Sequence, residues 1–488
     1  MRDQILVLNY NNVYAASIAA RLRAEKIYAK IIPGESSVES IMAEEALGLI
    51  LAGGLNGELP GGLDGQLLRA GIPVLALGDT AAAVALLLGA QAGEKIAVNE
   101  VDTLTLLPSR ITYELSESER VLGTVVPLQL TEDLEPLAQR DGSILGVMHK
   151  TLNIFALQCQ LETNDPDMMG LLMRFAQDIC GCTKWWGEDA FISAAKAEII
   201  EAAKGGQALC VMSGGLDSGV TALLAHRALG GRLQCLFVDT GLLRENEAEE
   251  FTAYYKRAGL NLHIIDAGER FLKALAGLVH PGEKKDAVHT TMQDVLDEAV
   301  QALSFSLVVQ STSGDALLFK EKKQPKTASI NSDQPVIAPL GELFKEEIRL
   351  IGEVLGLPQE MTRMQSFPWT GLALRVVGEC TRDKLGILRR ADAVFNEEIL
   401  ETGLNKRLWK YFAILYQDPF QSDTDMLVIA LRAVSASHLG SDVRAIPARL
   451  PYDLLERYTE RVLSAYPSVS KIVYDVTPAA NLQQIEWH

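Results

Sequence analysis

The stretch Ser213-Gly214-Gly215-Leu216-Asp217-Ser218-Gly219-Val220 decides the fold of this 488-residue chain. The apolar run Ala208–Met212 lies immediately before it and is typical of a buried strand. Behind it, apolar residues recur at helical spacing from Val220 to Leu229, and Gly230-Gly231 ends the pattern. We therefore predict a loop that joins a buried strand to a helix, which indicates an α/β fold.

The residue types in this loop suit a phosphate group. Glycines let the backbone turn sharply and approach a ligand closely, and the amides at the start of the following helix form an anion site. The serines add hydroxyl donors, and Asp217 can hold Mg²⁺ against phosphate oxygens. The alternative is an ordinary strand-to-helix turn. We predict that ATP binds to Ser213, Gly214, Gly215, Leu216, Asp217 and Ser218, with Asp217 also catalytic and a ligand of Mg²⁺.

The loop resembles the pyrophosphate loop of the ATP pyrophosphatase superfamily and lacks the Gly-Lys-Ser/Thr of a Walker loop. This resemblance implies cleavage of ATP at the α-phosphate, with pyrophosphate as the leaving group. The next apolar run, Gln234–Val238, is followed by Asp239 and Gly241. Open α/β sheets bind ligands at such strand ends, so Val238 and Asp239 are predicted to lie near the nucleoside.

The composition is that of a globular protein with sizeable cores, at 48% hydrophobic and 22% charged residues. A net charge of −18 argues against wide contact with a nucleic-acid backbone. Neither a basic-then-apolar leader nor an apolar run long enough to span a bilayer is visible. The six scattered cysteines, with only Cys180-Gly181-Cys182 closely spaced, suit reduced thiols. We expect a cytoplasmic protein that binds neither nucleic acid nor membranes.

The N-terminal region alternates apolar strands with helical segments, which predicts a mostly parallel sheet. The predicted strands are Ile5–Leu8, Ala29–Ile32, Leu47–Leu51 and Pro73–Leu77. This region resembles a class I glutamine amidotransferase domain.

The residues that carry glutamine hydrolysis in that family are replaced here. Gly78 stands where the family has its nucleophilic cysteine, and Gln160 stands where it has the histidine. Of the triad only Glu162 remains. Because a glycine cannot attack an amide and a glutamine cannot shuttle a proton, we expect a degenerate domain without glutaminase activity.

Further segments make the whole chain similar to the glutamine-hydrolysing GMP synthetase family. They are Glu269–Gly277, Pro339–Lys345, Leu355–Pro358, Leu372–Val376, Arg449–Tyr452 and Lys471–Thr477. The resemblance implies an amidotransferase-like domain over 1–183, a parallel-sheet ATP pyrophosphatase domain over 184–370 and a small α+β dimerisation domain over 371–488.

The acceptor side departs most from the family. Four stretches that hold a lid or xanthosine monophosphate in the family differ here: Lys320–Asn331, Phe367–Gly371, Tyr416–Asp423 and Ala479–His488. From what remains, the resemblance implies that Arg375 and Lys471 bind the acceptor and that Lys326 is a catalytic contact to ATP. The alternative for the lid lysines is a solvated run of charge.

We therefore expect an AMP-forming carbon–nitrogen ligase that uses ATP and Mg²⁺, adenylates a carbonyl oxygen of a small, nucleotide-like acceptor and takes ammonia from solution or a partner. We also expect a homodimer. Two alternatives stay open: a paralogue with a different acceptor, and a regulatory pseudoenzyme that only binds ATP. The acidic charge and the lack of a zinc set disfavour an enzyme that thiolates tRNA.

Overall fold

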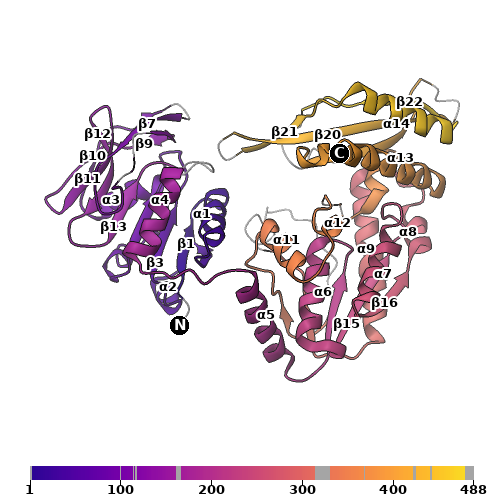
Figure 1. The fold of residues 1–488 in the computed structure, drawn as a ribbon, viewed down its shortest axis with the longest axis horizontal. Coiled ribbons are helices and arrows are strands. Elements are labelled where there is room, and N and C mark those ends of the chain that lie inside the picture. Colours follow the sequence, from indigo (N-terminus) through magenta and orange to yellow (C-terminus); the bar gives the residue numbers. More distant parts are fainter. Residues whose placement is uncertain are drawn as a thin grey trace. The chain divides into compact units, whose positions relative to one another are not determined.

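Figure 1 shows the computed structural model of the chain, in which two compact units are distinguished, Met1–Phe191 and Ile192–His488. The structure describes residues 3–98, 101–113, 115, 118–160, 166–313, 330–365, 367, 369–420, 425–439 and 442–478. The predicted domain boundaries at 183/184 and 370/371 remain predictions.

The first unit is built on a nine-stranded sheet with strand order β2-β1-β3-β4-β13-β12-β11-β7-β8. The strands from β2 to β13 in this order run parallel, and the others pair antiparallel. The strands are β1 (Ile5–Asn9), β2 (Ala29–Pro33), β3 (Gly48–Ala52), β4 (Val74–Leu77), β7 (Val101–Leu106), β8 (Ser118–Val121), β11 (Leu134–Arg140), β12 (Ser143–His149) and β13 (Ile154–Leu157). The helices are α1 (Asn12–Ala24), α2 (Val38–Ala43), α3 (Asp79–Leu87) and α4 (Pro166–Met173), with a 3₁₀ turn at Leu67–Arg69 and a π-helical turn at Arg174–Ile179.

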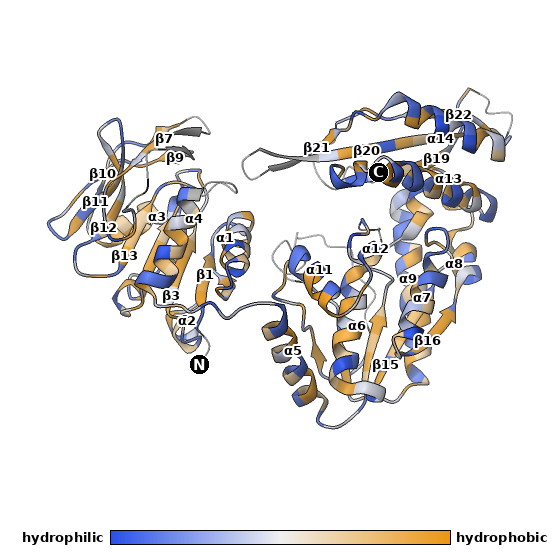
Figure 2. Ribbon diagram, in the orientation of Figure 1, coloured by the Kyte–Doolittle hydropathy of each residue, from blue (hydrophilic) through white to orange (hydrophobic). Residues whose placement is uncertain are grey.

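Two short ribbons complete this unit, β5 (Gln91–Ala92) with β10 (Leu128–Gln129) and β6 (Ile96–Ala97) with β9 (Thr124–Val125). All four predicted strands of the N-terminal region are confirmed. The central residues of β1, β3 and β4 are fully buried, as expected of parallel strands that are covered on both faces, whereas β2 at the edge of the sheet is only partly buried. Figure 2 shows the apolar character of β1 and β3 along their length.

The second unit contains a five-stranded parallel sheet with strand order β16-β15-β14-β17-β18. Its strands are β14 (Ala208–Met212), β15 (Leu233–Asp239), β16 (Asn261–Asp266), β17 (Leu307–Val309) and β18 (Val336–Ile337). Its helices are α6 (Leu216–Leu229), α7 (Glu247–Arg257), α8 (Gly268–Leu275), α9 (Pro281–Gln301), α11 (Lys345–Val354) and α12 (Gln359–Thr362), after α5 (Glu188–Ala203) and with a 3₁₀ turn at Gly230–Arg232. The predicted strand–loop–helix joint is confirmed as β14, residues 213–215 and α6.

A second, mainly antiparallel sheet follows in the same unit. Strand β20 (Leu427–Leu439) pairs antiparallel with β19 (Lys410–Gln417) and β21 (Asp442–Pro447), and parallel with β22 (Val469–Tyr474). The helices here are α13 (Arg382–Glu401) and α14 (Tyr452–Ala465), with 3₁₀ turns η4 (Gly371–Arg375) and η5 (Leu404–Lys406). The apolar run Leu431–Val434, which contains Arg432, lies within β20.

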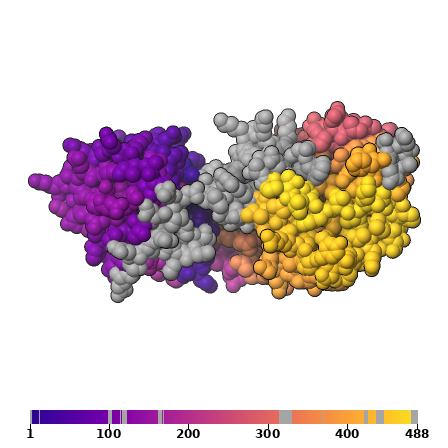
Figure 3. All heavy atoms as spheres, turned by 90° about the horizontal axis from the view of Figure 1, so that it is seen from above, coloured from indigo at the N-terminus to yellow at the C-terminus, as the bar shows by residue number. Residues whose placement is uncertain are grey.

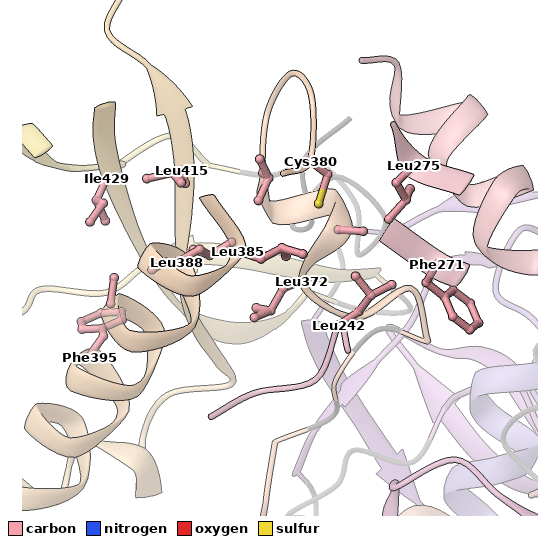
Figure 4. Close-up of a cluster of buried hydrophobic side chains, with 14 of the residues drawn as sticks. Leu242, Phe271, Leu275, Leu372, Cys380, Leu385, Leu388, Phe395, Leu415 and Ile429 are labelled. Carbon is pink, nitrogen blue, oxygen red and sulfur yellow. The ribbon is translucent and has the colours of Figure 1, made fainter. Parts of the chain in front are cut away.

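The two sheets of the second unit share one hydrophobic core. It runs from Phe271 and Leu275 of α8 through Leu388 of α13 to Leu415 and Ile429 of the C-terminal sheet (Figure 4). Seen from above, orange and yellow C-terminal residues cover much of the near face of this unit (Figure 3). This shared core fixes the C-terminal elements against the parallel sheet. Among the described residues no helix is both long and apolar enough to cross a bilayer, and all six cysteines are free thiols, as predicted.

Candidate active site

The loop between β14 and α6 is held in shape by its own side chains. The buried hydroxyl of Ser218 donates to the carbonyl of Gly215 at 2.8 Å and accepts from the Ser213 N–H at 3.1 Å. The Ser213 hydroxyl lies 3.3 Å from it. Gly214 has φ +87°, a conformation that glycine adopts without a steric penalty. The loop is therefore a preformed turn at the N-terminus of α6, where a helix presents unpaired N–H groups.

A lysine from another helix completes this end of α6. Lys345 Nζ lies 2.5 Å from Asp217 Oδ1, and both side chains are partly exposed to solvent. Lys345 is the first residue of α11, whose start is fixed by a 2.9 Å hydrogen bond from the Phe344 N–H to Glu347 Oε2. Lys345 was not among the site residues predicted from the sequence, although it ends the family-like segment Pro339–Lys345.

The oxygen ligands at this loop fit a magnesium ion that is also coordinated by phosphate oxygens. Mg²⁺ in nucleotide sites takes one or two carboxylates, several waters and phosphate oxygens. Asp217 offers one partly exposed carboxylate beside two serine hydroxyls. Within the described residues, no group of three or more His, Cys, Asp or Glu side chains could hold a metal ion by themselves.

Asp239 lies at the same edge of the parallel sheet as the loop. Met212, the last residue of β14, is in register with Phe237 of β15, so Asp239 projects just beyond that edge. Its carboxylate accepts a 2.9 Å hydrogen bond from the N–H of Gly241, which has φ +67°. Val238 is buried beside it. The structure therefore brings together the ATP-site residues predicted on two strands.

The two predicted acceptor residues lie apart. Arg375 is buried in η4, where its Nη1 is 3.4 Å from Asp392 Oδ1 and its guanidinium lies over the ring of Phe412 at 4.4 Å. Lys471 is about half exposed and lies beside Asp418 at the other end of β19. Phe412 and Asp418 are six residues apart along an extended segment, which corresponds to roughly 20 Å.

The carboxylate of Asp418 is already well supplied with partners. Its Oδ2 accepts from the Ser470 hydroxyl at 2.7 Å and lies 3.1 Å from Lys471 Nζ. The Phe420 N–H donates to Oδ1 at 3.0 Å. The Ser470 hydrogen bond, followed by that from Phe420 and the charge of Lys471, lowers the pKa of Asp418. Lys471 is thus one half of an ion pair with Asp418.

In the first unit, Gly78 follows β4 at the turn into α3, with φ +68° and ψ −138°. A Cβ atom there would lie 2.4 Å from the carbonyl oxygen of Gly54 and 2.8 Å from that of Gly53. The N–H of Asp79, directly after Gly78, donates to the same Gly54 carbonyl at 2.8 Å. The space beside Gly78 is therefore occupied by backbone.

Gln160, shortly after the end of β13, contacts the same backbone loop at Gly53 and Gly54. Its Nε2 donates to the Gly53 carbonyl at 3.2 Å. The buried carboxylate of Asp79 accepts from the N–H groups of Asn56 and Gly57 at 3.0 and 2.9 Å. Burial raises the pKa of Asp79. The predicted triad positions at Gly78 and Gln160 thus meet around one backbone loop.

Several predicted residues fall outside the described part of the chain. They are Glu162, Lys326 with most of the lid segment, Pro368, Gln421–Asp423 and Ala479–His488. Trp369 is described; its ring is partly exposed and meets His289 edge-on, with centroids 6.1 Å apart.

Comparison with known proteins supplies the family. Residues 397–487 match the family model of the GMP synthase C terminal domain. A glutamine-hydrolysing GMP synthase of Thermomicrobium roseum is 32% identical over 99% of this chain and 96% of its own length. One from Carboxydothermus hydrogenoformans is 32% identical over the whole of both chains. A solved structure from Thermoplasma acidophilum, described as that of a GMP synthase subunit, matches 37% of this chain and 94% of its own length, at 21% identity and a TM-score of 0.33. On the full-length similarity, this chain belongs to the glutamine-hydrolysing GMP synthase family.

Proposed function

We propose that this chain is a GMP synthase-like ATP pyrophosphatase that adenylates a carbonyl oxygen and completes the reaction with free ammonia instead of glutamine. The observation that carries the proposal is the preformed loop at the start of α6, with Lys345 against Asp217 and with Asp239 at the same sheet edge. Such a cluster offers backbone donors, hydroxyls, one cation and two carboxylates, which together suit a magnesium-bound triphosphate.

In the proposed reaction, the acceptor oxygen bonds to the α-phosphorus while the bond to the pyrophosphate oxygen breaks. The loop residues Ser213, Gly214, Gly215, Leu216 and Ser218 hold the pyrophosphate, and Lys345 balances its charge. Asp217 would hold Mg²⁺, which when bound would supply neutralisation of the phosphate charge, and Val238 and Asp239 hold the nucleoside. Ammonia then attacks the activated carbon and loses a proton to solvent, and AMP leaves with the oxygen as the carbon–oxygen bond breaks. The contribution of the protein is orientation and charge stabilisation.

The ammonia comes from solution or from a partner in this proposal. The first unit has no cysteine at Gly78, and the N–H of Asp79 is bonded to the Gly54 carbonyl. In a nucleophile elbow, the N–H after the nucleophile is a donor to the developing oxyanion. A site whose donor is engaged and whose nucleophile is absent supports a degenerate amidotransferase domain over 1–183.

The remaining parts of the proposal follow the family. Residues 184–370 form the ATP pyrophosphatase domain, and residues 371–488 form the domain through which the chain makes a cytoplasmic homodimer. The match of residues 397–487 to the GMP synthase C terminal domain supports the assignment of residues 371–488 as the C-terminal domain of this family. Lys326 remains the proposed lid contact to ATP.

A second candidate is a paralogue with an acceptor other than xanthosine monophosphate. The half-exposed cation predicted to bind the acceptor, Lys471, is compensated by Asp418 at 3.1 Å. A phosphate monoester would have to compete with that carboxylate. The buried cation Arg375 is likewise paired with Asp392. Both pairs favour an acceptor with less negative charge than a nucleotide. Arg375 and Lys471 would then contact the acceptor while they remain paired with Asp392 and Asp418.

The experiment supplies Mg-ATP and ammonium to the full chain, with a panel of carbonyl acceptors that includes xanthosine monophosphate. We expect release of pyrophosphate and AMP with at least one acceptor, and little with xanthosine monophosphate. Turnover of xanthosine monophosphate at about 1 per second or faster would contradict the second candidate. ATP binding without pyrophosphate release on the entire panel would favour a regulatory pseudoenzyme.

A further inference from the structure

Arg389 of α13 reaches the loop that follows β15. Its Nε–H donates to the carbonyl of Leu243 at 2.9 Å, and its Nη2 donates to the carbonyl of Gly241 at 2.6 Å. A guanidinium is a planar fork with fixed donor directions, so two carbonyls held together have a defined relative orientation. The side chain therefore fixes the backbone conformation of residues 241–243.

The same loop orients the carboxylate of Asp239. The N–H of Gly241 donates to Asp239 Oδ1 at 2.9 Å, while the carbonyl of the same glycine accepts from Arg389. Gly241 has φ +67°, and a Cβ atom there would lie 3.0 Å from the Cα of Gly268. One glycine in a restricted conformation thus connects the Asp239 carboxylate to the Arg389 guanidinium.

The carbonyl of Leu242, which lies between the Gly241 and Leu243 carbonyls, also accepts a hydrogen bond from a C-terminal element. The N–H of Leu372, in η4, donates to the Leu242 carbonyl at 2.8 Å. Leu242 and Leu372 are buried in the shared core, near Leu388 of α13 (Figure 4). Three consecutive carbonyls beyond β15 are therefore held by η4 and α13.

The neighbouring arginine makes different contacts. Arg390 Nη1 lies 2.8 Å from Glu245 Oε2 and 3.3 Å from Glu397 Oε1, in pairs that are partly exposed. Exposed ion pairs of this kind contribute little to the free energy of unfolding. Arg390 thus provides a matched control on the same helix with the same charge.

We infer that Arg389 is a positioning residue for the nucleotide site: it holds Gly241, and through it the Asp239 carboxylate, in the orientation that binds the nucleoside of ATP. The inference rests on the proposed function, because it presumes that ATP binds at this sheet edge. It also names α13, an element outside the parallel sheet, as a determinant of ATP affinity.

The test measures Mg-ATP binding by calorimetry and pyrophosphate release by steady-state kinetics for the full-length wild type and for Arg389→Met, Arg389→Lys and Arg390→Met. For Arg389→Met we expect Kd and KM for ATP to rise on the order of tenfold, with kcat within about twofold. Arg389→Lys recovers part of the affinity, because an ammonium can bind one carbonyl but cannot match the fork. Arg390→Met stays within about twofold of the wild type.

Equal ATP affinity in the wild type and in Arg389→Met would overturn the inference and leave the proposed function standing. Absence of ATP binding in the wild type would overturn both. Should Arg389→Met fail to fold, Arg389→Lys decides alone: a KM for ATP equal to that of the wild type would overturn the inference, and a rise of about threefold or more would support it.

Discussion

Restoring the missing side chains of the first unit should not restore glutaminase activity. The variant that tests this is Gly78→Cys with Gln160→His. The loss of stability caused by a side chain at residue 78 is measured separately with Gly78→Ala. A Cβ at residue 78 meets the carbonyl oxygens of Gly54 and Gly53 at 2.4 and 2.8 Å. Both are backbone atoms, so the loop at 53–54 has to move before any side chain fits.

The matched control is Gly71→Ala in the same unit. Gly71 has φ +80°, close to the +68° of Gly78, but a Cβ there meets no atom within 4 Å. Both variants bear the cost of a side chain at positive φ, about 1–2 kcal/mol. Only Gly78→Ala adds the collision, and overpacking of this kind costs about 1–3 kcal/mol.

Scanning calorimetry of the full chain compares the two variants. A unit of this size loses about 2–4 °C in Tm per kcal/mol, so Gly78→Ala should unfold roughly 2–12 °C below Gly71→Ala. Glutamate release from glutamine by the cysteine–histidine variant should stay at background, because the Asp79 N–H is bonded to the Gly54 carbonyl at 2.8 Å. Equal Tm values for the two alanine variants, or clear glutamate release, would refute the reasoning.

Three further predictions concern the second unit. Lys345→Met removes the cation 2.5 Å from Asp217 and should weaken Mg-ATP binding in calorimetry about tenfold, whereas Arg349→Met on the same helix should leave it unchanged. Burial raises the pKa of Glu247 above its ordinary 4.5, so the native state binds this proton more tightly than the unfolded state does. The free energy of unfolding should therefore fall as pH rises from 4.5 through the raised pKa. Urea titrations of Glu247→Gln should lack this fall, and the same pH profile in Glu247→Gln and the wild type would contradict the prediction. Light scattering at micromolar concentration should give about twice the single-chain mass, and the single-chain mass would count against a dimer.

The elements that were predicted well from the sequence are those with local signals. β14, the glycine-rich loop and α6 follow from an apolar run, two glycines and a helical repeat within about twenty residues. The parallel strands were predicted because burial on both faces leaves a continuous apolar run. The apolar run Leu307–Val309 forms β17, and the polar residues that follow it are not part of the strand.

The contacts that complete the site lie far apart in the sequence. Lys345 reaches Asp217 across 128 positions, and Arg389 reaches Gly241 across 148. Neither residue carries a local pattern that names its partner, because tertiary packing brings them together. No local pattern indicates that Arg375 and Lys471 lie at opposite ends of β19, or that the Gly54 carbonyl occupies the space beside Gly78.

The most direct test of the central claim supplies the full chain with Mg-ATP and the best acceptor of the panel, and compares ammonium with glutamine as nitrogen donor. AMP, pyrophosphate, the aminated product and glutamate are followed together. We predict aminated product, AMP and pyrophosphate with ammonium, and neither aminated product nor glutamate above background with glutamine. Product formation with glutamine accompanied by glutamate release, or no pyrophosphate with either donor, would contradict the account.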